Sequence, residues 1–206
     1  MRWCDMTSEK AGLPILSFAD LAAWESWLAA QPRTSKGMWL KLAKAGNSES
    51  SLTKVQAIDG ALCHGWIDGQ LGSFDDAWFL TRFTPRKPMS KWSENNRKRA
   101  DVLCGEGRVA AAGLAEIAAA RADGRWDAAY APASTAAEPD DLKAALDADP
   151  AARAFFDTLT GANRYAILYR VQTAKKPETK AARIATFVAM CAAHETLHGT
   201  VPKKRA

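Results

Sequence analysis

The sequence has no long apolar run. No stretch approaches the roughly 20 consecutive apolar residues that a membrane-spanning helix needs. Its first residues, MRWCDMTSEKAGLPILSF, carry charges early and lack the continuous apolar segment of a secretory signal peptide. These absences favour a protein without a transmembrane segment and without an export signal.

Cysteine and histidine are both scarce. The four cysteines are widely separated and form no C-x-x-C pair: Cys4, Cys63, Cys104 and Cys191. This spacing argues against a disulfide framework and against a thiolate zinc site, so we expect a reducing, cytoplasmic environment. With three histidines in the chain, a site built on imidazoles has few candidates. No internal repeat is visible.

Apolar residues and basic charge are what the chain does have. Apolar side chains make up 48% of its 206 residues, enough to bury a core in one compact unit or two small ones. The formal net charge is +5, and the 82–108 window, with eight basic and three acidic residues, holds all of this excess. We therefore expect any anion-binding site to lie in this window.

The hydrophobic pattern predicts an α+β fold. Alternating apolar positions indicate strands at 37–43, 65–71 and 77–84, the last two forming a hairpin, in a small antiparallel sheet with flanking helices. After residue 90 nearly every segment has helical spacing. The small, proline-containing stretch 131–138 resembles a linker, so we predict an N-terminal α+β domain over 1–130 and a helical C-terminal module over 139–199.

Four separated motifs occur in order along the chain. They are ALCHGWIDGQ (61–70), RFTPRKPMSKWSENN (82–96), GRWDAAY (124–130) and AKKPETKAARI (174–184). Together they resemble the YdeI/OmpD-associated (OmdA-like) family of bacterial proteins over about residues 18–190. The chain departs from the family pattern at His64, where an aromatic residue is usual, at Lys54, where tyrosine is common, and at Lys180 and Ala182, which replace arginines.

The resemblance implies an N-terminal α+β unit followed by a helical module, in agreement with the pattern. It also implies a link to bacteriocin or cationic-peptide resistance and to a porin. It supplies no reaction, cofactor or catalytic residue.

HETLH (194–198) matches the H-E-x-x-H signature of zinc proteases. On a helix this spacing places two imidazoles on one face, and the apolar stripe of the last predicted helix continues onto His194 and His198. A zinc protease needs a third ligand, and the following GTVPKKRA contains none. We therefore interpret the motif as a helix end with Gly199 as its stop, and assign no metal and no cofactor.

The motif CHGWIDG offers two further candidates. Cys63 and His64 are neighbours whose side chains point apart, which makes a poor nucleophile–base pair. Asp68 is a carboxylate within a short apolar strand, and we predict a structural ion pair with Arg82 on the partner strand. An acid–base catalytic role for Asp68 is the alternative.

The segment 82–96 is the strongest candidate for a binding site. Basic, hydroxyl, aromatic and amide side chains surround a strand-to-helix junction that is braced by two prolines, with Ser90 predicted to open the helix. The predicted anion site consists of Arg82, Arg86, Ser90, Trp92 and Asn96. We expect weak, salt-sensitive binding of phosphate-bearing ligands, and we expect Arg86→Ala to abolish it with little effect on the melting temperature. The alternative is a solvated basic face with Trp92 in the core.

Three function classes follow from the sequence. The first is a non-enzymatic binding protein in envelope or cationic-peptide stress resistance, as the resemblance implies. The second is a binder of anions or, less favoured, nucleic acid through the 82–108 window. The third and weakest is an enzyme, either a zinc hydrolase at HETLH or an acid–base catalyst at Asp68. The sequence does not specify an oligomeric state.

Overall fold

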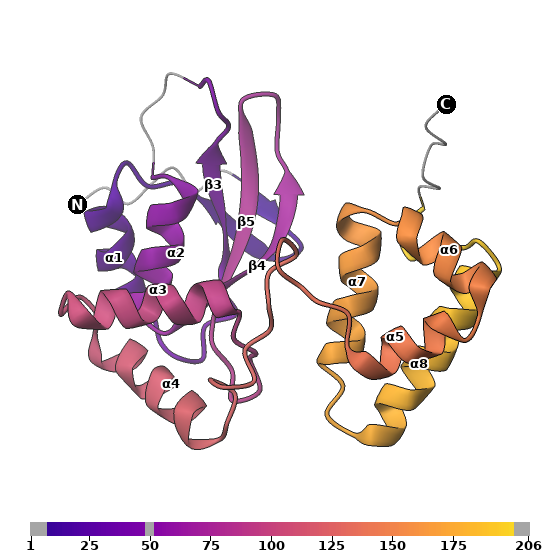
Figure 1. The fold of residues 1–206 in the computed structure, drawn as a ribbon. Helices are drawn as coiled ribbons and strands as arrows, with labels where there is room; N and C mark the ends of the chain where they lie inside the picture. Colours follow the sequence, from indigo (N-terminus) through magenta and orange to yellow (C-terminus); the bar gives the residue numbers. More distant parts are fainter. Residues whose placement is uncertain (1–7, 48–51, 200–206) are drawn as a thin grey trace. The chain divides into compact units, whose positions relative to one another are not determined.

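The computed structural model of the chain describes residues 8–47 and 52–199. It separates into two compact units, Met1–Ala129 and Tyr130–Ala206. In Figure 1 the first unit runs from indigo to rose and the second from orange to yellow. Cys4 lies outside the described residues, and the other three cysteines are free thiols. Among the described helices, none has both the length and the apolar character to cross a membrane.

The N-terminal unit is built on a mixed five-stranded sheet of order β1-β2-β3-β5-β4. Its strands are β1 (Glu9–Lys10), β2 (Leu13–Leu16), β3 (Met38–Ala43), β4 (Trp66–Ser73) and β5 (Trp78–Pro85). The predicted strands 37–43, 65–71 and 77–84 correspond to β3, β4 and β5, which pair antiparallel. The predicted fold class is therefore confirmed. The sheet also contains a parallel pair, β2 with β3, which the sequence did not predict. Helix α1 (Leu21–Ala29) connects these two strands.

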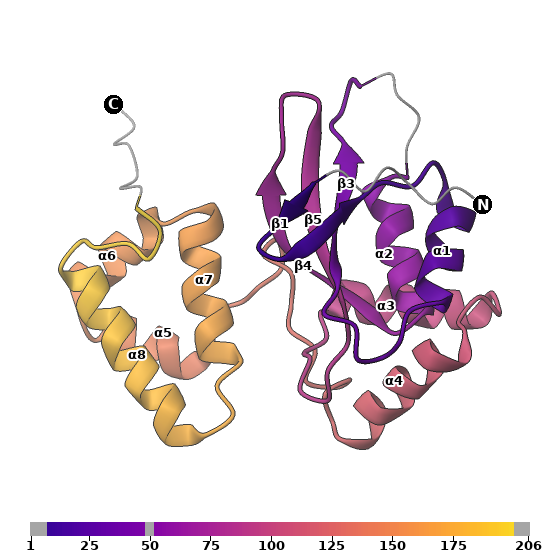
Figure 2. The ribbon, with the colours of Figure 1, turned by 180° about the vertical axis from the view of Figure 1, so that it is seen from behind.

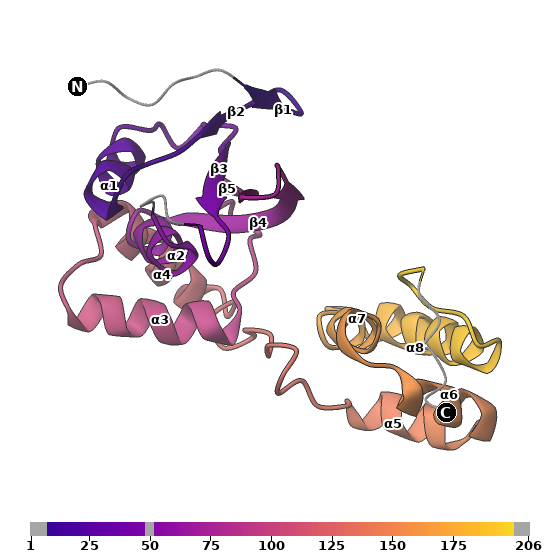
Figure 3. The ribbon, with the colours of Figure 1, turned by 90° about the horizontal axis from the view of Figure 1, so that it is seen from above.

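One face of the sheet carries the main core of this unit. Helices α1 and α2 (Lys54–Cys63) cover this face (Figures 1 and 3). Alternate residues of β3 belong to the same core cluster as Trp24 of α1 and Phe83 of β5, which are completely buried. Figure 2 shows the opposite face, with the β1–β2 hairpin in front. That face buries a smaller cluster: Leu13, Ile15, Trp39 and Leu80. Because this cluster is small, part of the second face remains open for a site.

Two further helices complete the N-terminal unit. They are α3 (Glu94–Gly105) and α4 (Ala111–Ala122), packed around Trp92, Leu103 and Trp126. Ser93, not Ser90, caps α3: its Oγ accepts a hydrogen bond from the backbone N–H of Asn96 at 3.1 Å. The prediction that Ser90 opens this helix is wrong, because the two serines of SKWSEN are both suitable caps and the chain uses the second.

The C-terminal unit is a small helical bundle. It consists of α5 (Asp140–Asp147), α6 (Pro150–Thr158), α7 (Gly161–Gln172) and α8 (Pro177–Ala192). Their apolar faces enclose one core around Leu146, Phe156 and Val171, all fully buried. Proline in the first turn starts α6 and α8, where its missing N–H costs no helical hydrogen bond.

Candidate functional site

A basic cleft of about 650 Å³ lies on the second face of the N-terminal sheet. It is lined by the β1–β2 turn, the loop before β3, side chains of β4 and β5, and the residues that follow β5. The lining residues are Ala11, Gly12, Leu13, Arg33, Thr34, Ser35, Lys36, Trp39, Gln70, Arg82, Thr84, Pro85, Arg86 and Lys87. Five of these described residues are basic and none is acidic. A concave surface lined by charges of one sign attracts ions of the other sign.

The strand register directs Arg82 into this cleft. Arg82 of β5 lies directly opposite Trp39 of β3. Directly paired residues of antiparallel strands point to the same face, so Arg82 shares the face of Trp39 and of the small apolar cluster. Thr84, two residues further along β5, lies on this face as well and also lines the cleft.

A β-bulge brings Gln70 beside Arg82. The β4–β5 pairing is regular from Trp66 to Asp68 and resumes at Leu71, and the register shifts between them. Gly69 and Gln70 therefore both lie opposite Arg82. A bulge of this kind redirects a side chain, and the exposed Gln70 lines the same cleft as Arg82.

Three of the five basic side chains are electrostatically uncompensated. Lys36, Arg82 and Lys87 take part in none of the ion pairs found among the described residues. The Nε of Arg82 is buried without a hydrogen-bond partner among those residues. Because this atom is closed to solvent, an anion in the cleft would be held by the terminal nitrogens of the Arg82 guanidinium.

The other two basic side chains form the wall of the cleft. Arg33 donates from Nη1 to the carbonyl of Gly65 at 2.9 Å and from Nη2 to the carbonyl of Arg86 at 3.1 Å. It also forms an ion pair with Glu116. The same Gly65 carbonyl accepts the backbone N–H of Arg86 at 2.9 Å. These bonds tie the loop before β3 to the segment after β5.

The structure brings together only part of the anion site predicted from sequence. Arg82 and Arg86 line the cleft, whereas Ser90, Trp92 and Asn96 do not. Trp92 is buried, with the Arg86 guanidinium over its ring, and so anchors the core. Ser90 accepts from the backbone N–H of Lys87 and stabilises the turn after β5. Asn96 lies in the first turn of α3, where its backbone N–H is used by the Ser93 cap.

The predicted ion pair between Asp68 and Arg82 is wrong. Asp68 lies opposite Phe83, which belongs to the helix-covered face, whereas its neighbour Arg82 points to the other face. Successive residues of a strand alternate between faces, so the two charges are on opposite sides of the sheet. Arg82 is therefore available to the cleft.

Three later arginines of the 82–108 window serve the fold. Arg99 forms two hydrogen bonds to the buried carboxylate of Asp59, at 2.7 and 2.6 Å, and these raise the pKa of Arg99. Arg108 pairs with Glu25 and Glu106. Arg97 donates to the carbonyl of Trp126 at 3.1 Å. Three arginines of the later part of the window are therefore held by contacts within the fold.

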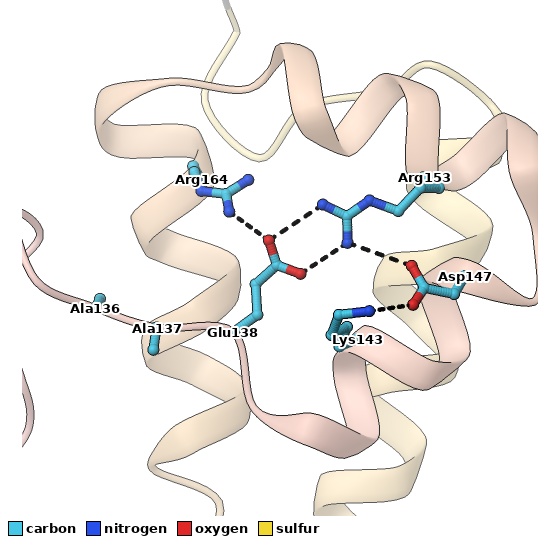
Figure 4. Close-up of a pocket in the computed structure, with 7 residues that line it drawn as sticks. All are labelled: Ala136, Ala137, Glu138, Lys143, Asp147, Arg153 and Arg164. Atoms are coloured by element: carbon cyan, nitrogen blue, oxygen red, sulfur yellow. Dashed lines mark hydrogen bonds and ion pairs between the residues drawn. The ribbon is translucent and has the colours of Figure 1, made fainter.

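A second hollow, of about 610 Å³, lies in the C-terminal unit (Figure 4). Here each basic group has an acidic partner. The carboxylate of Glu138 accepts from both Arg153 and Arg164, and Asp147 pairs with Lys143 and Arg153. Hydrogen bonds from Arg153 and Arg164 hold the pKa of Glu138 below its ordinary value. Because its charges are already paired, this hollow offers an external ion little.

The geometry at HETLH does not match a zinc protease. Helix α8 ends at Ala192, and His194 has a positive φ of 57° just beyond it. His194 stacks on Phe155 at 5.0 Å, whereas the backbone N–H of His198 donates to Asn163. The two imidazoles are therefore not one turn apart on a helix, and the stop lies well before Gly199. Among the described residues, no group of three or more His, Cys, Asp or Glu side chains is placed to hold a metal.

Cys63 and His64 do not form a catalytic pair. Cys63 is buried in the core, and burial raises the pKa of its thiol to about 11. His64 follows α2, and burial lowers the pKa of its imidazole. A thiol with so high a pKa is a weak nucleophile at neutral pH, so Cys63 acts as a small apolar group.

Sequence reasoning missed the other parts of the cleft. Arg33 and Lys36 lie in the loop before β3, and Arg33 is 53 residues from Arg86, whose carbonyl it contacts. Gln70 lies in β4, before the predicted site. Only the sheet topology brings these three residues together with Arg82 and Arg86. The loop PRTSKG (32–37), with two basic and two hydroxyl side chains between a helix and a strand, was the available signal.

Two family models match different parts of the chain. Residues 16–116 match the model of a domain of unknown function, DUF8412. Residues 135–194 match the family described as Bacteriocin-protection, YdeI or OmpD-Associated (OmdA). The family suspected from sequence is confirmed, but over a shorter segment than the expected 18–190. Of the four quoted motifs, 174–184 lies in the OmdA match, and 61–70 and 82–96 lie in the DUF8412 match.

Searches of the curated proteins and of the solved structures found no match to the chain.

Proposed function

With an OmdA-family segment at residues 135–194, this chain is, we propose, a bacteriocin-protection-type protein that acts by binding an anionic, phosphate-bearing ligand. The observation that carries the proposal is the cleft of the N-terminal unit, with five basic and no acidic residues among its described lining residues. Binding, not catalysis, is favoured because Cys63, His64 and HETLH lack the geometry of a catalytic site.

The sign of the charge limits how protection works. A basic cleft in a chain of net charge +5 repels cationic peptides, so direct capture of such a peptide is disfavoured. We infer that the protein acts through an anionic cellular ligand, in the cytoplasm that its cysteine usage favours. Nucleic acid is the less favoured ligand, because Arg99 and Arg108 of the basic window are held by carboxylates.

The binding step is tested by isothermal titration calorimetry of the full chain with inorganic pyrophosphate at low salt. The matched variants are Lys36→Gln, in the cleft, and Lys98→Gln, an exposed lysine of α3 outside it, which change the net charge equally. Lys36→Gln is expected to weaken binding and Lys98→Gln to leave it unchanged. Raising the ionic strength from roughly 0.01 to 0.15 M shortens the Debye length from about 30 to 8 Å and should weaken binding.

Equal effects of the two lysine variants would mean that only the net charge matters, and the cleft would not be the site. The absence of any binding by the unmodified chain at low salt would refute the proposed function.

The protective role has its own test, in bacteria that depend on this protein for survival of a cationic bacteriocin. Arg82→Gln is expected to lower survival to that of cells without the protein, and Lys98→Gln is expected to preserve it. Full protection by a variant that has lost pyrophosphate binding would separate the role from the cleft.

A further inference from the structure

We infer that the ligand of the cleft is a small phosphorylated, hydroxyl-rich molecule of the sugar phosphate class, an inference that rests on the anion-binding function proposed above. Three features of the cleft carry it: the number of uncompensated charges, the space beyond a single phosphate, and the chemistry of the neutral lining.

The uncompensated charge suits a phosphate monoester. Lys36, Arg82 and Lys87 form no ion pair with any described residue. A phosphate monoester carries about −1.5 to −2 charges at neutral pH and presents three acceptor oxygens. Arg82, with its buried Nε, is the deeper of these groups, and the exposed lysines lie at the rim. The planar guanidinium of Arg82 is suited to hold two phosphate oxygens at once.

The cleft is larger than a phosphate group requires. Its volume of about 650 Å³ falls within the range of about 300 to 1,000 Å³ that is typical of pockets for small molecules. A water molecule occupies about 30 Å³ in the liquid, and a phosphate group takes the place of only a few such molecules. A lone phosphate therefore fills only a small part of the cleft. The remaining space admits a body attached to the phosphate.

The neutral part of the lining offers hydrogen bonds. Four such side chains line the cleft: Thr34, Ser35, Gln70 and Thr84. Gln70 is the most informative of them, because the bulge in β4 turns this exposed amide toward the side of Arg82. An amide both donates and accepts hydrogen bonds, which is what vicinal hydroxyl groups of a sugar require.

The same lining offers no platform for a nucleobase. Trp39 is the aromatic member of the described lining residues, and its side chain is only 4% exposed. Its indole N–H donates to the carbonyl of Lys10, and the Lys10 ammonium lies 4.9 Å from its ring centroid. Proteins that hold bases without sequence preference stack them on accessible aromatic rings. A hydroxyl-bearing body therefore fits this cleft better than a base does.

The experiment compares five probes by calorimetry at low salt with the full chain: glucose 6-phosphate, inorganic phosphate, glucose, adenosine 5′-monophosphate and a short oligothymidylate. Glucose 6-phosphate is expected to bind at least about tenfold more tightly than inorganic phosphate, a difference of 1.4 kcal/mol. Glucose alone is expected not to bind, and the adenosine nucleotide is expected to bind no more tightly than inorganic phosphate.

Two variants locate the contacts. Gln70→Ala is expected to reduce the affinity for glucose 6-phosphate to that for inorganic phosphate and to leave inorganic phosphate unaffected. Arg82→Gln is expected to abolish binding of both. If Arg82→Gln does not fold, Gln70→Ala and Lys36→Gln still test the inference. Gln70 and Lys36 are exposed, so replacing them does not remove a buried side chain.

The outcomes separate this inference from the function on which it rests. If no probe binds, the anion-binding function itself fails. If glucose 6-phosphate and inorganic phosphate bind equally, or Gln70→Ala changes nothing, the cleft binds anions but not a sugar phosphate. Tighter binding of the nucleotide or the oligothymidylate than of glucose 6-phosphate would likewise overturn the ligand class while leaving anion binding intact.

Discussion

The guanidinium of Arg86 lies over the indole ring of Trp92, with 3.6 Å between Cζ and the ring centroid. Arg86 is only 3% exposed and Trp92 only 1%. Nη1 of Arg86 also donates to the carbonyl of Lys91 at 3.2 Å. This stack joins the end of β5 to the start of α3, so Arg86 is a structural member of the cleft wall.

Arg86→Ala is therefore expected to destabilise the N-terminal unit. A desolvated cation–π contact contributes about 2 kcal/mol or more, and truncating a buried side chain adds lost packing. We expect the free energy of unfolding to fall by at least about 2 kcal/mol. Urea unfolding followed by tryptophan fluorescence measures it, because all eight tryptophans lie within the first 126 residues.

Lys87→Ala is the control for this prediction, since Lys87 is the exposed neighbour of Arg86 and is expected to change stability by less than about 0.5 kcal/mol. If both variants unfold like the unmodified chain, the stack does not stabilise the fold. The sequence-based expectation of a nearly unchanged melting temperature for Arg86→Ala would then be correct.

Asp59 and Arg99 are expected to stabilise each other across α2 and α3. Asp59 is 6% exposed and accepts two hydrogen bonds from one guanidinium. Hydrogen bonds to charged groups contribute about 1.5–3 kcal/mol, so Asp59→Asn should cost an amount in this range. A double-mutant cycle with Arg99→Gln should show a coupling energy above about 0.5 kcal/mol.

The matched control is the exposed pair of Arg121 and Asp101, joined at 2.9 Å on α4 and α3. Exposed pairs contribute about 0–1 kcal/mol, so the same cycle should give a smaller coupling energy. A coupling energy at Asp59–Arg99 no larger than at this surface pair would show that burial adds nothing.

Local patterns of the sequence predicted the elements of the sheet but not the pairing between them. The alternation in GMWLKLAK gave β3 to within one residue, because that alternation is the pleat itself. The wrong prediction for Asp68 concerned its partner on the neighbouring strand, not the strand itself. Choosing Arg82 as its partner required the register, and a shift of one residue moves a side chain to the opposite face.

The cleft depends on contacts that the sequence does not show. Arg33 reaches the Arg86 carbonyl across 53 residues of chain, and the bulge that turns Gln70 has no separate sequence signature beyond Gly69. HETLH shows the reverse case. Its spacing fits a helix, but α8 ends two residues before His194, because that residue takes a left-handed backbone conformation.

The stability of the C-terminal unit is expected to fall in acid through Glu138. Hydrogen bonds from Arg153 and Arg164 lower the pKa of Glu138 in the folded chain from its ordinary value of 4.5. A lowered folded pKa means that the stabilisation is fully present above pH 4.5 and is lost as the pH falls through the folded value. Glu138→Gln should therefore be less stable than the unmodified chain at pH 7 and should lose this difference in acid.

Tyrosine signals isolate this unit. All three tyrosines, Tyr130, Tyr165 and Tyr169, belong to the C-terminal unit, so the nuclear magnetic resonance signals of their rings follow its unfolding. The control is Glu178→Gln, an exposed carboxylate of α8, which is expected to leave the pH profile unchanged. Parallel pH profiles of Glu138→Gln and the unmodified chain would contradict the assignment.

Removal of metal is expected to leave the C-terminal unit unchanged. His194 stacks on Phe155, and the backbone N–H of His198 donates to Asn163. The two histidines are therefore held by separate contacts and not as a pair of metal ligands. Dialysis against a chelator should not change the melting temperature followed by the tyrosine signal. About one zinc ion per purified chain, lost in His194→Ala, would restore the zinc hydrolase interpretation.

Gly65 is expected to be required both for folding and for the cleft. Its φ is +71°, and a Cβ at this position would lie 2.9 Å from the carbonyl oxygen of Ala112 and 3.0 Å from Nη1 of Arg33. Its own carbonyl accepts from that Arg33 nitrogen and from the backbone N–H of Arg86. Gly65→Ala therefore adds a steric clash to the cost of a left-handed alanine and displaces Arg33 from the cleft wall.

Gly107→Ala is the matched control for Gly65→Ala. Gly107 has a φ of +69°, but a Cβ there would meet nothing within 4 Å, so alanine should cost only the backbone term of about 1–2 kcal/mol. Gly65→Ala is expected to cost clearly more in urea unfolding and, unlike Gly107→Ala, to weaken pyrophosphate binding in the fraction that stays folded. If the two variants cost the same and binding is unchanged in both, a side chain at position 65 does not clash with α4. The Gly65 carbonyl would then not hold the arginines of the cleft.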